Sequence, residues 1–365
     1  MGDDIVLVIV VVTALGFDFT NGFHDTANVV ATSVSTKAMR PRIAVTYAAI
    51  LNFVGAFISL EVAATVAEDV VKASAVTPTV VFAGLIGAIS WNLITWYYGL
   101  PSSSSHALIG GVVGSTVAAV GTGAVLTDGV VGEVLVPAIV APILAFAVGA
   151  IGILASYRIV GRLRPGPVTR GYRLGQTVSA GLLALAHGTN DAQKTMGVIT
   201  LALVANGSLS EDAGVPFWVV VSAATAIAFG TYSGGWRIMR TVGTRIIKMD
   251  AAQGFSAQGA GAAVILASTH FGFPLSTTQV ISGAVMGSGA GKRVSAVRWG
   301  VAGNIVVAWL LTFPAAAAIG AAAYGVTRVF GTGAVGPVVV AVAAVLLIVS
   351  AFARRARQGA PVPAG

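Results

Sequence analysis

The sequence contains no cysteine and few charged residues: of its 365 residues, 9% are charged and 56% are hydrophobic. Soluble domains carry about 25% charged residues, so a soluble enzyme is excluded. The absence of cysteine excludes a disulfide-stapled secreted domain, and the apolar content excludes a disordered protein. The apolar runs are continuous rather than alternating, which argues against a β-barrel. The composition therefore indicates a helical protein that crosses a membrane several times.

The apolar runs predict an all-α polytopic membrane protein with about 11 to 12 membrane segments, because a helix needs roughly 20 apolar residues to cross the hydrocarbon. The chain has 46 glycines and 13 prolines, which interrupt several of these runs, so some segments are expected to be broken or re-entrant. The predicted spans are 5–36, 43–60, 79–98, 102–125, 134–156, 177–204, 215–235, 255–271, 275–290, 299–327 and 334–352.

Basic residues gather on one side of this topology. All of the 21 Lys and Arg residues except Lys72, Lys194 and Arg328 fall in the loops of that side. Cytoplasmic loops carry such an excess. We therefore expect a multi-pass protein of the cell (plasma) membrane with its N-terminus outside and its C-terminus in the cytoplasm. The same distribution explains the net charge of +8 without a nucleic-acid ligand.

Two segments of the chain resemble each other. The 17 residues GLPSSSSHALIGGVVGS (99–115) and GFPLSTTQVISGAVMGS (272–288) share seven positions. Upstream of each lies a shorter pair, NGFHDTAN (21–28) and HGTNDAQK (187–194), in which Asp25 corresponds to Asp191. The predicted topology orients the two copies in opposite directions.

The chain is therefore predicted to hold an inverted-topology repeat, an architecture of secondary transporters that bind their substrate near the midplane. The predicted divisions are 1–156 (first repeat), 157–176 (basic cytoplasmic linker), 177–327 (second repeat), 328–352 (additional transmembrane helix) and 353–365 (cytoplasmic tail).

Four charged residues, Asp18, Asp25, Asp191 and Lys194, fall inside otherwise apolar spans. Each costs about 3 kcal/mol on insertion scales, so each is expected to face a cavity or another charge. Asp25 and Asp191 recur at one repeat position, which favours function over a helix-packing ion pair. Asp18 has no counterpart in the second half, and its role stays open between structure and function. Lys194 is either a structural partner of Asp191 or a substrate or coupling group.

Hydroxyl residues follow a proline in each copy: Ser102, Ser103, Ser104 and Ser105 after Pro101, and Ser276, Thr277 and Thr278 after Pro274. Proline and serine favour a helix start, whose free N–H groups attract a small anion. Two such starts entering from opposite sides would surround an oxyanion. The alternative is small polar residues that allow close helix packing.

Two carboxylates near an oxyanion indicate coupled transport, because they repel a dianion unless they are protonated, hold a cation or meet a metal complex. His24 adjoins Asp25 and either titrates near neutral pH or orients it. His106 and His187 are expected to donate hydrogen bonds, and His270 receives no role. No HExxH motif and no nucleophile with an adjacent base is present. We therefore predict no catalytic residue, no resident metal site, no cofactor and no enzymatic activity.

These motifs resemble the inorganic phosphate transporter (PiT) family, and especially its bacterial low-affinity members. The resemblance rests on segments that extend to about residue 316: DFTNGFHDTAN (18–28), ATSVSTKAMRP (31–41), GLPSSSSHALIGG (99–111), AHGTNDAQK (186–194), QGFSAQ (253–258), GFPLSTTQVISGA (272–284) and GNIVVAWLLTFPAA (303–316).

The resemblance implies a phosphate symporter that works by alternating access. The implied partners are inorganic phosphate, a coupling cation (H⁺ or Na⁺) and the lipid bilayer, with divalent metal carried alongside phosphate and a homodimer left open. The implied substrate-binding residues are Asp25, Asn28, Ser103, Ser104, Ser105, Asn190, Asp191, Ser276, Thr277 and Thr278, and the coupling residues are His24, Asp25, Asp191 and Lys194.

Two positions depart from the general family signature. His24 stands where the signature has Asn, and Lys194 stands where sodium-coupled relatives tend to have Asn. A fixed ammonium replaces a bound cation and repels Na⁺, so proton coupling is expected. A sodium-coupled phosphate symporter and a sulfate permease on the same fold are the alternatives. Phosphate donates a hydrogen bond to a carboxylate, whereas sulfate does not, and the two aspartates therefore favour phosphate.

Overall fold

The computed structural model describes residues 2–210, 212–331 and 333–357, and nearly all of them are helical. The described residues contain no strand, only one isolated β-bridge between Val71 and Val125. The all-α prediction is therefore confirmed.

The helices follow the predicted spans closely. The first half holds α1 (Gly2–Ser35), α2 (Pro41–Gly55), α3 (Glu61–Glu68), α4 (Pro78–Tyr98), α5 (Ser104–Val120), α6 (Thr127–Gly129) and α7 (Val136–Val160). The second half holds α8 (Pro165–Ala205), α9 (Phe217–Ser233), α10 (Trp236–Arg240), α11 (Ala251–His270), α12 (Thr277–Lys292) and α13 (Trp299–Val329), and α14 (Val335–Arg357) follows. Short 3-10 or π turns are η1 (Ala73–Ala75), η2 (Thr122–Ala124), η3 (Val130–Leu135), η4 (Thr241–Arg245) and η5 (Val294–Ala296).

Four helical stretches are long and apolar enough to cross a membrane: Asp4–Ser35, Pro78–Tyr98, Thr127–Val160 and Trp299–Val329. A fifth arises if α9 and the helix after it, which are bent by 58°, form one broken span. These helices establish a multi-pass membrane protein. Helix α8 is less apolar because its middle carries the motif 187–194. The larger count of 11 to 12 segments stays a prediction, although α2, α5, α8, α11, α12 and α14 also coincide with predicted spans.

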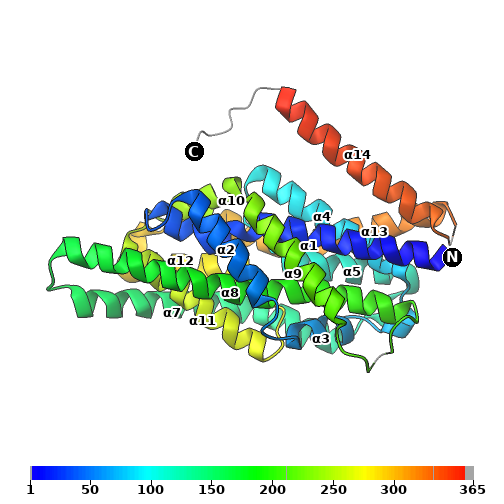
Figure 1. Cartoon of the computed structure of the whole chain (residues 1–365), viewed down its shortest axis with the longest axis horizontal. Helices are drawn as coiled ribbons and strands as arrows, with labels where there is room; N and C mark the ends of the chain where they lie inside the picture. The colour runs from blue at the N-terminus through cyan, green and yellow to red at the C-terminus, as the bar shows by residue number, and fades with distance from the viewer. Residues whose placement is uncertain (1, 211, 332, 358–365) are drawn as a thin grey trace.

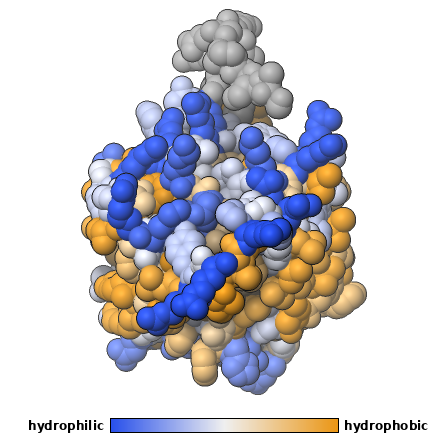
Figure 2. Space-filling view, turned by 90° about the vertical axis from the view of Figure 1, so that its left-hand side faces the viewer, coloured by the Kyte–Doolittle hydropathy of each residue, from blue (hydrophilic) through white to orange (hydrophobic). Residues whose placement is uncertain are grey.

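The predicted linker 157–176 is mostly helical. Helix α7 continues to Val160 and α8 begins at Pro165, a residue well suited to a first helical turn. The turn between the two helices lies at the end of the molecule opposite the N-terminus (Figure 1). Figure 2 faces this end and shows hydrophilic side chains across it, with hydrophobic residues on the flanks below. Of the predicted tail 353–365, α14 includes the residues up to Arg357, and the rest lies outside the described residues.

The helix contacts are reciprocal between the two halves. Helix α5 packs along α13 while α12 packs along α7, and α1 packs against α9 while α8 packs against α2. Helices α1 and α8, which carry the two aspartate motifs, also pack against each other. An inverted repeat produces this exchange of partners. In Figure 1, α14 leans away from the bundle and lies outside this pattern.

Glycines allow α5 and α12 to approach their neighbours at backbone distance. A Cβ atom at Gly114 of α5 would lie 2.1 Å from the carbonyl oxygen of Ala317, and one at Gly287 of α12 would lie 2.0 Å from that of Phe146. These two glycines occupy equivalent repeat positions. Small residues are the usual means of close helix packing in membranes. They hold the two short helices firmly against α13 and α7.

Gly287→Ala is predicted to lower the free energy of unfolding by about 1–3 kcal/mol, because the new methyl group overpacks a backbone contact. Gly114→Ala should behave alike. The measurement is the apparent unfolding temperature of the purified protein in detergent. Gly303→Ala is the control, since a Cβ there meets nothing within 4 Å. Equal unfolding temperatures for Gly287→Ala and Gly303→Ala would contradict this packing argument.

Candidate functional site

Two helical hairpins bring the hydroxyl motifs together. Helices α4 and α5 form one hairpin and α11 and α12 the other, and each turns at a left-handed glycine, Gly99 (φ 67°) or Gly272 (φ 78°). At the end of the first hairpin away from its turn, the segment before α4 is linked to the segment after α5: the Lys72 N–H donates to Ala124 O at 3.0 Å. In the second hairpin the residue before α11 is linked to the end of α12 by an ion pair, in which Lys292 Nζ lies 2.8 Å from Asp250 Oδ2.

The two hairpin tips meet in the interior. The Ser105 hydroxyl at the start of α5 donates to Leu275 O, just before α12, at 2.8 Å. Ser103 and Ser276 are the N-caps of these helices and accept the His106 and Gln279 N–H groups at 3.1 and 3.3 Å. Two of the predicted phosphate-binding hydroxyls therefore serve as helix caps in this conformation. The helix starts themselves face each other, as the sequence predicts.

Asp25 of α1 connects both helix starts. Its Oδ2 accepts the Ser104 hydroxyl at 2.7 Å, and its Oδ1 accepts the Thr278 hydroxyl at 3.1 Å. His24 Nδ1 lies 2.6 Å from the same Oδ1. All four side chains are buried. One carboxylate thus joins a hydroxyl from each half of the chain, and an imidazole stands beside it.

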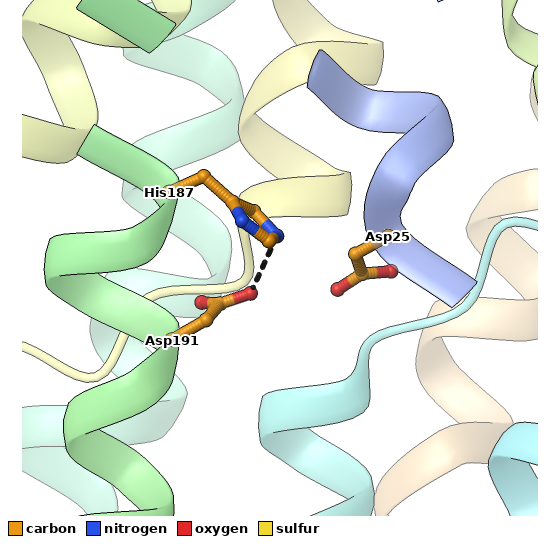
Figure 3. A group of neighbouring side chains, drawn as sticks. All are labelled: Asp25, His187 and Asp191. Carbon is orange, nitrogen blue, oxygen red and sulfur yellow. Dashed lines mark ion pairs between the residues drawn. The ribbon is translucent and has the colours of Figure 1, made fainter. Parts of the chain in front are cut away.

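Asp191 of α8 occupies the equivalent place in the second half. Its Oδ2 accepts the Thr277 hydroxyl at 3.1 Å and lies 3.0 Å from His187 Nε2. Its Oδ1 accepts a hydrogen bond from Lys194 Nζ. Figure 3 shows Asp25 facing the His187–Asp191 pair from α1. The contact of Thr277 with Asp191 repeats that of Ser104 with Asp25, because the two hydroxyls share one repeat position.

Lys194 is fully buried and all three of its N–H donors are used. The ammonium donates to Asp191, to the Ser105 hydroxyl at 2.6 Å and to Leu275 O at 2.7 Å. At the equivalent position, Asn28 Nδ2 donates to the Thr278 hydroxyl at 2.8 Å. Lys194 therefore places a fixed positive charge between the halves, where the first half has a neutral amide.

The remaining predicted residue, Asn190, donates to the Thr269 hydroxyl at 2.8 Å and to Phe273 O at 3.1 Å. The Oδ1 atoms of Asn190 and Asn28 are buried and have no hydrogen-bond partner among the described residues. The substrate-binding and coupling residues predicted from the sequence are all buried. His270, to which no role was assigned, makes a ring contact with Phe271.

Three further polar residues adjoin the cluster and were not among the predicted substrate-binding or coupling residues, although Ser102 belongs to the predicted hydroxyl run. Thr95 and Ser102 lie 2.7 Å apart, and their hydroxyls are each 3.4 Å from His24 Nε2. His187 was expected to donate a hydrogen bond, but its place beside Asp191 was not predicted. The four-residue spacing between them was the available signal, because it puts both side chains on one helix face.

The cluster also presents three potential cation ligands. One atom each from Asp25, His187 and Asp191 lies within 4.8 Å of the others. Two carboxylates and an imidazole suit a divalent cation. The sequence alone predicted no metal site, because the three residues come from two distant segments and match no metal motif.

These features define the class of the protein: a polytopic helical membrane protein with a buried, charged site between two similar halves. The family model described as "Phosphate transporter family" matches residues 21–170 and 165–320. The chain therefore belongs to the phosphate transporter family, and the resemblance noted in the sequence is confirmed.

Similar proteins agree with this assignment. The chain is 57% identical over 326 residues to a "probable low-affinity inorganic phosphate transporter" of Mycobacterium tuberculosis, covering 89% of this chain and 78% of that protein. It is 44% identical over 322 residues to a protein of the same description from Bacillus subtilis, covering 88% and 96%. These relatives are transporters rather than enzymes, which confirms the absence of an enzymatic activity.

A solved structure titled "The sodium-dependent phosphate transporter" has the same fold. The TM-score is 0.80, and the match covers 89% of this chain and 99% of that one. The sequence identity is 24%, so the likeness shows the fold alone.

Lys194→Met is predicted to lower the free energy of unfolding by about 3–5 kcal/mol, because it leaves Asp191 as an uncompensated buried charge. The double variant Lys194→Met/Asp191→Asn should recover most of this loss, since it removes both charges. Apparent unfolding temperatures of the wild type, both single variants and the double variant complete the cycle. A single variant Lys194→Met as stable as the wild type would contradict the role of this ion pair.

Proposed function

We propose that this chain is a secondary active phosphate symporter that works by alternating access and is driven by protons. The observation that supports it is the meeting of two hydroxyl-bearing helix starts at one buried pair of carboxylates. Helix starts supply N–H donors and a positive dipole end, both suited to a tetrahedral oxyanion. Ser104, Ser105, Thr277 and Thr278 supply hydroxyl donors, and Asn28 and Asn190 add amide groups.

Because the site is negatively charged, phosphate would need a positive charge to enter together with it. Asp25 and Asp191 together with Lys194 leave one net negative charge when both imidazoles are neutral. Adding a phosphate dianion to this buried site would be strongly unfavourable without compensation. A proton on His24, or one shared between phosphate and Asp25, reduces the repulsion. Phosphate entry is thereby tied to the entry of positive charge.

Lys194 favours protons over Na⁺ as the coupling ion. Its ammonium already occupies a position between Asp191, Ser105 and Leu275 O, with all three N–H groups bonded. A monovalent metal ion placed there would meet a like charge at close range. A sodium-coupled symporter is the alternative, and Na⁺-free transport separates the two.

Neutral metal phosphate is a substrate form that the site accommodates. The divalent ion of such a complex would meet Asp25, His187 and Asp191, whose ligand atoms are close together, while the phosphate oxygens meet the helix starts. Sulfate is the competing anion on the same fold. Near neutral pH it has no proton to donate, so it leaves a carboxylate such as Asp25 facing an unprotonated oxyanion.

The orientation belongs to the same proposal. The basic end formed by α7 and α8 lies in the cytoplasm, and the N-terminal end of α1 lies outside the plasma membrane, in agreement with the positive-inside distribution. The two halves then alternate in exposing the site. Whether one chain or a homodimer forms the working unit does not change this account, because each chain contains a whole site.

The purified protein in proteoliposomes is predicted to accumulate phosphate in Na⁺-free buffer when an inward proton gradient is imposed, because protons supply the compensating charge. Radiolabelled phosphate uptake is measured while Na⁺, Mg²⁺ and pH are varied independently, with excess sulfate as competitor. A strict requirement for added Na⁺ would refute proton coupling, and uptake blocked equally by sulfate would refute phosphate selectivity.

Asp25→Asn and Asp191→Asn are each predicted to reduce phosphate uptake at least tenfold, because an amide holds neither a proton nor a cation in exchange. The asparagine side chain has nearly the same shape, so membrane insertion should be unchanged. Uptake and the amount of reconstituted protein are measured together. Wild-type uptake rates in both variants would remove the carboxylates from the coupling scheme.

A further inference from the structure

Asp18 lies on α1 two turns before Asp25 and is 0% exposed. No described residue forms a hydrogen bond with either of its carboxylate oxygens. A buried ionised carboxylate without donors is costly inside an apolar span. Asp18 is therefore stable at this depth only as a neutral carboxylic acid or beside a positive charge.

The side chains next to Asp18 are polar and are themselves buried. Thr195 on α8 and Asn21, one turn further along α1, are the polar donors that face its carboxylate. Both side chains are buried, and neither the Asn21 amide nor the Thr195 hydroxyl bonds to a described residue. Asp18, Asn21 and Thr195 thus form a small group of buried polar side chains between two packed helices, and we call this group the Asp18 pocket.

Helix periodicity connects this pocket to the central cluster. Asp18, Asn21 and Asp25 follow one face of α1, and Asp191 and Thr195 follow one face of α8, because residues three or four apart are neighbours. Since α1 and α8 pack against each other, the pocket continues the cluster toward the N-terminal end of α1. In the predicted orientation this is the outer side.

An outer cavity approaches the same part of α8. It has a volume of about 520 Å³, is lined by Glu68, Asp212 and Lys72 among others, and reaches α8 at Thr200. Thr200 lies about 7.5 Å of helix rise beyond Thr195. Its hydroxyl is also buried and has no partner among the described residues. The cavity therefore ends on α8 between one and two helical turns beyond Thr195.

The charged groups that face Asp18 come from α8 and are Asp191 and Lys194. On its own helix the next are His24 and Asp25. Helices α4 and α9, which also pack against α1, contain no Asp, Glu, His, Lys or Arg. The N–H donors of Lys194 are all bonded elsewhere. No positively charged side chain therefore pairs with Asp18 among the described residues, and a compensating positive charge would come from an ion bound from solution.

We propose that the Asp18 pocket binds a coupling proton, separately from phosphate. Asp18 takes the proton from water on the outer side, becomes a neutral carboxylic acid, and returns it to water on the cytoplasmic side when the halves alternate. A proton needs one acceptor, whereas a hard metal cation such as Ca²⁺ takes about six to eight oxygen ligands, more than the pocket offers. This inference rests on the proposed phosphate transport and adds one charge to each cycle.

The test compares the wild type with Asp18→Asn in proteoliposomes, at equal pH on both sides and without Na⁺. Phosphate exchange at zero gradient should stay within twofold of the wild type, because the phosphate site is intact. Phosphate accumulation driven by a K⁺ diffusion potential of about 60 mV should fall about tenfold at steady state, since one charge fewer is carried. Asp18→Glu should restore it, and the exposed Asp128→Asn is the matched control.

The outcomes separate this proposal from the proposed function. A wild type that does not exchange phosphate refutes phosphate transport itself. Equal accumulation by the wild type and Asp18→Asn overturns the proton site alone. Loss of exchange in both Asp18→Asn and Asp18→Ser also overturns it, because the pocket would then belong to the phosphate site or to folding. Accumulation that requires Na⁺ only in the wild type assigns the pocket to Na⁺ and overturns the proton assignment.

Discussion

A buried ammonium group connects the helices at the centre of this protein. Lys194 reaches from α8 to Asp191 of its own helix, to Ser105 at the start of α5 and to the carbonyl of Leu275 before α12. In a low-dielectric interior such a charge is tolerable only when it is paired and fully hydrogen-bonded. The positions of both hairpin tips are therefore coupled to one side chain.

The hairpins explain how such a polar centre is placed inside an apolar bundle. A helix start leaves backbone N–H groups without partners, and these are allowed at membrane depth only where protein or a ligand satisfies them. Ser103 and Ser276 satisfy part of this need as caps. The glycines of α5 and α12 let both short helices lie against α13 and α7 at backbone distance. Packing against α13 and α7 thus holds α5 and α12 in place, so that the backbone N–H groups at their starts are left facing the centre.

Much of this arrangement could be predicted because short sequence motifs determine it. The proline followed by hydroxyl residues marks a helix start by local chemistry, and the repeat of Asp25 as Asp191 marks a shared position. The place of His187 beside Asp191 could be suspected from its spacing, whereas its proximity to Asp25 depends on how α1 packs on α8. The contacts of Thr95 and Ser102 with His24 depend on tertiary packing in the same way. The helical character of the linker was hidden by its many arginines, which mark the cytoplasmic side but do not oppose helix formation.

The two halves agree where the oxyanion would be held and differ where charge would be carried. Ser104 and Thr277 bind equivalent aspartates, and Asn28 and Lys194 reach equivalent hydroxyls on opposite helix starts. Against this shared frame, Lys194 replaces an amide with a cation and His24 stands where the second half has Asn190. Asp18 has alanine, Ala184, as its counterpart.

A site made only of hydroxyl and N–H donors would bind an anion without coupling its movement to any other ion. A proton or cation can be tied to the cycle only if some group changes its charge or its partners as the halves exchange roles. Under the proposed function, the equivalent pair Asp25 and Asp191 supplies such groups, and His24 and Asp18 supply further ones at unequal positions. The repeat therefore accounts for the facing helix starts and the paired aspartates, and the substitutions within it account for the unequal charge of the two halves.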